Sequence, residues 1–105
     1  MCHSQSANTG AGGWRPIDES DQAKVSSIVR TVLTQLQQQN KIVPHKIENV
    51  IVVEALQQVV SGWNYCLVLR LMPSNYILRI NVYQPLNSGE LKITNVAINK
   101  NGVIV

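Results

Sequence analysis

The stretch LQQVVSGWNYCLVLRL, residues 56–71, decides the fold of this 105-residue chain. In its second half the side chains alternate, with Tyr65 and the following leucines on one face of a predicted strand and Cys66 on the other. LQQVV is a second strand-like run, and Ser61-Gly62 separates the two runs, which indicates a β-hairpin. Hairpin tips are usually polar. This tip is flanked by Val59, Val60 and Trp63.

Further strands are predicted on both sides of this hairpin. IENVIVVEALQQVV, residues 47–60, is rich in β-branched residues and too long for a flat strand, so we expect a bend or a bulge. YILRINVY, 76–83, and LKITNVAI, 91–98, are the third and fourth strands, with MPSN and QPLNSGE as turns. Consecutive strands joined by turns indicate an antiparallel meander.

A long amphipathic helix is predicted before the strands, over about residues 20–39. Spacings of three and four place its apolar residues on one face: Val25, Ile28, Val29, Val32, Leu33 and Leu36. The other faces carry Lys24, Arg30, Gln35 and Gln38. Candidate residues for its ends are Asp18, Ser20 and Asp21 at the start and Asn40 at the stop. We therefore expect an α+β fold, one long helix packed across an antiparallel four- to five-stranded sheet.

Composition limits the possible functions. Hydrophobic residues make up 45% of the chain, so we expect it to fold, with a flexible tail over residues 1–11 and a single domain over residues 12–105. The net charge of +3 comes from scattered Lys and Arg, which argues against nucleic-acid binding. No run approaches the ~20 apolar residues of a membrane span, so we expect no membrane association.

The cysteines and the N-terminus bear on localisation. Cys2 and Cys66 are too few for the disulfide framework of a small secreted domain, so we expect free thiols and a reducing, cytoplasmic compartment. The polar N-terminus is no secretory signal. A secreted protein whose signal peptide has been removed is the alternative.

No catalytic or metal-binding pattern stands out. Cys66 lies within a strand, and neither His3 nor His45 has a spacing that pairs it with a cysteine. Acidic residues cluster at the helix start, where they favour the helix dipole. We therefore expect no enzyme activity, no metal and no cofactor.

The unusual apolar residues gather at turns. Alternate turns of a meander lie on the same edge, so the first tip and the turn at Pro85-Leu86 should be neighbours, and the segment around Gly12 could reach them. Apolar side chains exposed on one edge would form a wedge for a cleft in another protein. The alternative is that the valines tuck under the sheet and Trp63 covers the core.

This arrangement resembles the cystatin superfamily, particularly its single-domain stefin branch. The first-hairpin signature Gln-x-Val-x-Gly stands here as Gln58-Val59-Val60-Ser61-Gly62. NVYQPLNSGELKITNVAINKN, residues 81–101, is similar to the stefin strand, hairpin and strand in order and spacing. Gly12-Gly13 precedes the helix at the place where the family keeps its N-terminal glycine.

The resemblance implies a reversible, competitive inhibitor of papain-like cysteine proteases such as cathepsins. In that family an N-terminal segment and two hairpins enter the active-site cleft. The expected protease-binding residues are Gly12, Gly13, Gln58, Val59, Val60, Ser61, Gly62, Trp63, Pro85 and Leu86. A cystatin-fold interaction module without protease inhibition is the alternative.

Departures from the family pattern qualify this expectation. Leu86 stands where secreted cystatins have a tryptophan, and the four cysteines of that branch are absent, which favours the stefin type. Thr9-Gly10-Ala11 is less bulky than the segment in many members, so the N-terminal segment should contribute little. Asn40 lies near the loop through which some cystatins inhibit legumain, but QQNKIVP does not resemble that motif, and a helix cap is expected.

We expect mainly a monomer, with a minority of domain-swapped dimer. Valine is strained where a tight turn requires unusual backbone angles, and opening the first turn would merge its two strands into one. Family members exchange strands in this way.

Overall fold

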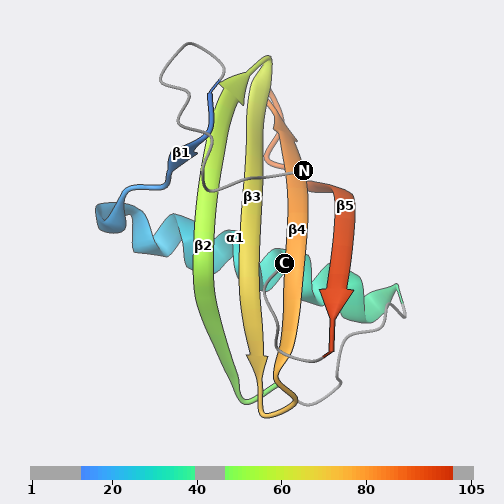
Figure 1. Cartoon of the computed structure of the whole chain (residues 1–105). Helices are drawn as coiled ribbons and strands as arrows, with labels where there is room; N and C mark the ends of the chain where they lie inside the picture. The colour runs from blue at the N-terminus through green and yellow to red at the C-terminus, as the bar shows by residue number, and fades with distance from the viewer. Residues whose placement is uncertain (1–12, 40–46, 101–105) are drawn as a thin grey trace.

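One helix lies across one face of a five-stranded antiparallel sheet in a computed structural model of the protein (Figure 1). The structure describes residues 13–39 and 47–100. The sheet order is β1-β2-β3-β4-β5, so every strand pairs with its neighbours in the sequence. The predicted α+β fold is therefore confirmed.

The long helix and the four strands after it follow the order predicted from the sequence, and a short strand and a 3₁₀ turn come before them. Their bounds are Arg15–Pro16 (β1), Glu19–Asp21 (η1, a 3₁₀ turn), Gln22–Gln38 (α1), Asn49–Val60 (β2), Gly62–Met72 (β3), Tyr76–Pro85 (β4) and Lys92–Asn99 (β5). Residues 73–75 form the turn between β3 and β4, as expected from MPSN. Among the described residues, no helix is long and apolar enough to cross a membrane.

Helix α1 is shorter than the predicted helix because its first turn is 3₁₀. Asp18 caps that turn, its carboxylate accepting a hydrogen bond from the Ser20 N–H at 3.0 Å. The other end closes at Gln39, whose N–H donates to the Gln35 carbonyl at 3.0 Å. The predicted stop, Asn40, lies outside the described residues.

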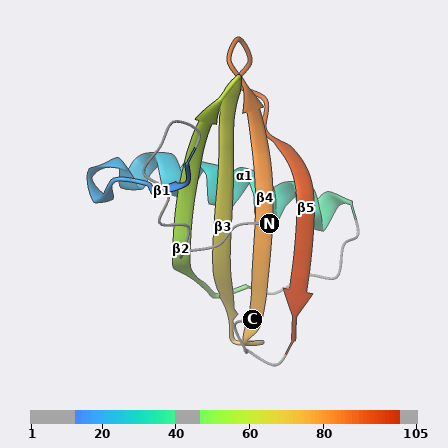
Figure 2. The same cartoon turned by 45° about the horizontal axis from the view of Figure 1, so that its top comes forward.

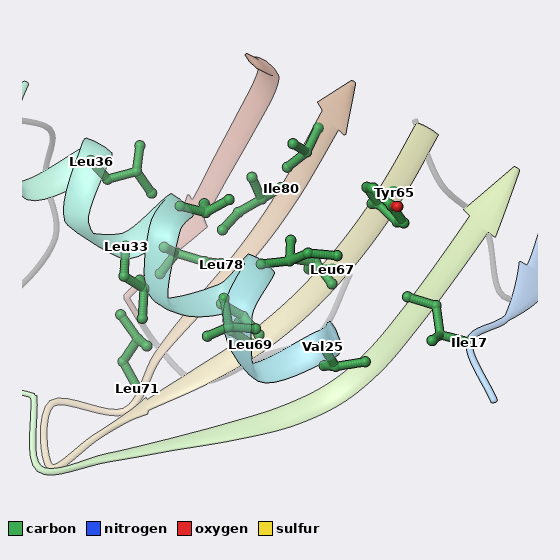
Figure 3. Close-up of a cluster of buried hydrophobic side chains, with 14 residues drawn as sticks. Ile17, Val25, Leu33, Leu36, Tyr65, Leu67, Leu69, Leu71, Leu78 and Ile80 are labelled. Atoms are coloured by element: carbon green, nitrogen blue, oxygen red, sulfur yellow. The ribbon is translucent and has the colours of Figure 1, made fainter. Parts of the chain in front are cut away.

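The core forms between α1 and the sheet face that it covers (Figure 3). The apolar helix residues named from the spacing are all buried, which confirms that prediction. They pack against the inward residues of β3 and β4: Tyr65, Leu67, Leu69, Leu71, Leu78, Ile80 and Val82. The leucines that alternate on one face of the predicted strand are therefore the residues that face the helix.

Strand β2 contains the expected irregularity. Its register against β3 shifts between Val52 and Glu54, which places a bulge at Val53. Beyond the bulge, β2 pairs with the short strand β1, with Arg15 opposite Gln57 and Pro16 opposite Leu56. This pairing fixes where the chain approaches the sheet before the helix.

The outer face of β3 corrects one prediction. Cys66 is fully buried there beside Leu56 and Trp14, and it is disulfide-bonded. The expected free thiol at Cys66 is therefore wrong, because strand alternation does not reveal which distant residue reaches a side chain. Cys2, the only other cysteine of the sequence, lies outside the described residues.

Candidate functional site

The tip of the first hairpin exposes its valines. Val59 is 56% and Val60 43% exposed at the end of β2, although both are apolar. Ser61 forms the bend that follows and is also exposed. The idea that these valines tuck under the sheet is therefore wrong, and the exposed tip is the expected one.

Gly62 makes the turn possible. Its φ is +139°, a region that side-chain-bearing residues rarely adopt. A Cβ at this position would also lie 2.6 Å from the carbonyl oxygen of Gln84 in β4. In this hairpin the residue with a positive φ is therefore Gly62, whereas Val59 and Val60 have negative φ angles. Domain swapping stays a prediction, but the valine strain that motivated it is not found.

The second hairpin lies directly beside the first. Gly62 pairs with Pro85 across β3 and β4, and Leu86, which follows Pro85, is 64% exposed. The Ser88 N–H donates to the Pro85 carbonyl at 3.3 Å, which closes this turn. Figures 1 and 2 show the arrowheads of β2 and β4 at the same end of the sheet, as the meander predicts. We call the exposed side chains of Val59, Val60 and Leu86 the apolar edge.

The described segment 13–16 lies toward the same end of the sheet. Strand β1 is antiparallel to β2, with Arg15 opposite Gln57, so Arg15 is nearer than Pro16 to the tip of the first hairpin. Gly13 lies in this segment and is half-buried. Gly12 was also expected at the site, but it lies outside the described residues.

Trp63 packs against the core, and its predicted contact with a protease stays a prediction. It is half-buried on the helix side of β3 and packs against the core cluster. The Lys24 ammonium of α1 lies 4.8 Å from the centroid of the indole and donates to Gln57 at 3.2 Å. A cation over an aromatic face is attracted by the ring, so Lys24 ties the helix to the base of the hairpin.

Gln58 acts inside the hairpin. Its side-chain oxygen accepts a hydrogen bond from the Asn64 amide at 3.1 Å, across the β2–β3 ladder. The pair joins the two strands just below the tip. The first-hairpin signature thus contains both exposed and structural side chains.

Tyr83 is a site residue that the sequence did not reveal. Its hydroxyl donates to the Ser61 carbonyl at 2.7 Å, from β4 to the tip of the first hairpin. Tyr83 alternates along β4 with the core residues Leu78, Ile80 and Val82. Only the register, with Asn64 opposite Tyr83, brings its ring beside Gly62, and a careful alignment of the two predicted strands could have found it.

Comparison with known proteins assigns the chain to a family. The model of the cystatin domain matches residues 12–101, which is most of the sequence. The chain belongs to the cystatin family. Neither curated proteins nor solved structures give a match. Members of the cystatin family are inhibitors of cysteine proteases rather than enzymes.

The cystatin domain brings the described site residues to one end of the sheet. The tip of the first hairpin lies beside the Pro85-Leu86 turn there, and β1 pairs with β2 below the tip, with Arg15 opposite Gln57. Trp63 stands below them as support, since it faces the helix. Among the described residues, no three His, Cys, Asp or Glu side chains gather closely enough to hold a metal.

Proposed function

We propose that the protein is a reversible, competitive inhibitor of papain-like cysteine proteases of the cathepsin type. The observation that carries the proposal is the apolar edge, with exposed fractions of 56% for Val59, 43% for Val60 and 64% for Leu86. Apolar side chains gathered on one rim of a small protein are typical of a contact surface. Membership of the cystatin family supports a protease cleft as the partner of that surface.

The binding free energy of the proposed complex would come from apolar surface on turns that are already ordered. Burying apolar surface stabilises a complex by about 25 cal/mol per Å². Turns that are already ordered lose little conformational freedom on binding. Inhibition, rather than cleavage, requires that the bound turn keep its peptide bonds away from the near-attack geometry that the catalytic thiolate needs.

The stefin type is the finer proposal. Leu86 follows Pro85 at the second turn, where secreted cystatins carry a tryptophan, and this supports a stefin-like contact with less buried area. The compartment is a separate question. The disulfide at Cys66 supports the secreted alternative over the cytoplasmic one, since disulfides persist in oxidising surroundings.

The proposal is tested by titrating papain with the purified protein. Wild type should inhibit competitively and reversibly, and Val60→Asp should weaken inhibition about thirtyfold or more, as expected for a central contact. The reason is that a carboxylate at the tip would lose its water inside an apolar cleft.

Val53→Asp is the matched control. Val53 is 41% exposed against 43% for Val60 and lies on the same strand, far from the apolar edge. It should leave inhibition unchanged. No inhibition by wild type at micromolar concentration would refute the proposal and leave the interaction-module hypothesis in its place.

A further inference from the structure

Tyr83 forms a hydrogen bond to the Ser61–Gly62 peptide bond at the tip of the first hairpin. Its hydroxyl donates to the carbonyl oxygen of Ser61 at 2.7 Å, and that carbonyl belongs to the Ser61–Gly62 bond. A Cβ on Gly62 would lie 2.9 Å from the Tyr83 hydroxyl and 3.1 Å from Cε1 of its ring. The ring therefore occupies the space that a side chain at position 62 would fill.

The position of this ring is fixed by the sheet. Tyr83 is half-buried and stands between Asn64 of β3 and Lys92 of β5 as cross-strand neighbours. An aromatic side chain over a cross-strand glycine restores packing that the glycine lacks. The donor thus belongs to a rigid element, whereas the acceptor belongs to an exposed turn.

A cysteine protease would need this same carbonyl to move. In cleavage the thiolate would add to the Ser61 carbonyl carbon, the Gly62 amine would leave with a proton, and water would then release the Ser61 carboxylate. The carbonyl oxygen must meet donors of the oxyanion hole at about 2.7–3.1 Å. An oxygen aimed at Tyr83 of its own chain points elsewhere until that hydrogen bond breaks.

We propose that Tyr83 is a positioning residue that makes this cystatin an inhibitor and not a substrate, by holding the Ser61–Gly62 peptide bond away from attack. The inference rests on the proposed function. It differs from a role in stability because it concerns one bond: loss of the hydroxyl exposes Ser61–Gly62 to cleavage while the fold persists.

The test uses Tyr83→Phe, which keeps the ring over Gly62 and removes only the donor. Wild type and variant are incubated with papain, and intact mass, the bond broken and residual papain activity are followed over time. Tyr83→Phe should be cut at Ser61–Gly62 about fivefold to tenfold faster than wild type, the scale of one hydrogen bond. Papain activity should return as the variant is consumed.

Tyr76→Phe is the matched control. Tyr76 begins β4 at the far end of the sheet, opposite Leu71, so the variant should be cut at Ser61–Gly62 no faster than wild type. A thermal melt of each variant checks the fold. Tyr83→Phe that inhibits as long as wild type and stays intact, or that is cut only at other bonds, would overturn the inference.

The same experiment distinguishes failure of the proposed function from failure of the inference about Tyr83. Wild type that does not slow papain at all would refute the inhibitor proposal. The inference would then be judged from the cleavage pattern alone, since it requires faster cutting at Ser61–Gly62 in the variant whether or not papain is inhibited. Equal rates at that bond would overturn it.

Discussion

Gly62 joins the two requirements of the first hairpin, a turn and a close approach. Its φ of +139° suits the turn, and the Gln84 carbonyl fills the space beside it. The first requirement could be predicted from the signature, because tight turns select glycine. The second could not, because it depends on the register of β4.

Gly62→Ala should therefore destabilise the protein by about 1–3 kcal/mol, the cost of a residue held in an unfavourable backbone region. Gly89→Ala is the matched control, since no atom lies within 4 Å of a Cβ there. That variant should stay within about 0.5 kcal/mol of wild type. Urea denaturation measures the free energy of unfolding of both variants. Equal losses would show that neither the backbone angle of Gly62 nor its closeness to Gln84 makes an added Cβ costly.

Trp63 shows that a residue beside an exposed turn can pack against the core. Its place beside the tip predicted exposure, but its side chain alternates to the helix face, where Lys24 lies over the ring. The same lysine ammonium is 5.2 Å from the centroid of Tyr65. Strand alternation carried back from Tyr65 would place Trp63 on the same face as Tyr65. Here alternation is a better guide to the orientation of the side chain than the position of the residue beside a turn.

At the scale of elements, period and spacing predicted most of the structure. The buried stripe of α1, the inward leucines of β3 and the bulge in β2 all followed from local pattern. The position of β1 did not, because a pairing of only Arg15 and Pro16 is too short for a periodic signal. At the site, the exposed valines and Leu86 were predicted from turns, whereas Tyr83 and Lys24 act through contacts between elements.

The start of α1 offers a pH-dependent test. The pKa of Asp18 lies below its ordinary value of 3.8, because the Ser20 backbone N–H and then the Ser20 side chain stabilise the carboxylate. A lowered folded-state pKa means that the carboxylate contributes stability above the ordinary value and loses it as the pH falls through the folded value. Asp18→Ala should thus lower Tm at neutral pH, and the gap to wild type should narrow below pH 3.8.

Asp21→Ala is the control for this effect. Asp21 precedes α1 but makes no side-chain cap hydrogen bond, so its loss should change Tm less at neutral pH. Melts followed by circular dichroism measure both variants. A gap for Asp18→Ala that is the same at every pH would show that the ionised cap is not its cause.

At the scale of the whole molecule, the described sheet contains a disulfide-bonded cysteine, Cys66, in its buried middle. Cys66→Ala should lower the free energy of unfolding by about 2–5 kcal/mol, as for a native disulfide in a small protein. Cys2→Ala should match it, because the sequence holds no third cysteine. A wild-type chain that reacts with a thiol reagent in urea without reductant would contradict the bond.

The bulge in β2 has a bearing on how the protein behaves when concentrated. Among the described residues, β1 covers only the upper part of that strand, and below it Ile51, Val52 and Val53 are 47%, 41% and 41% exposed on an open edge. Such an edge is a template on which a strand of another molecule can add. The bulge interrupts the regular row of donors and acceptors that growth of a fibre requires, so we expect it to oppose aggregation through this edge.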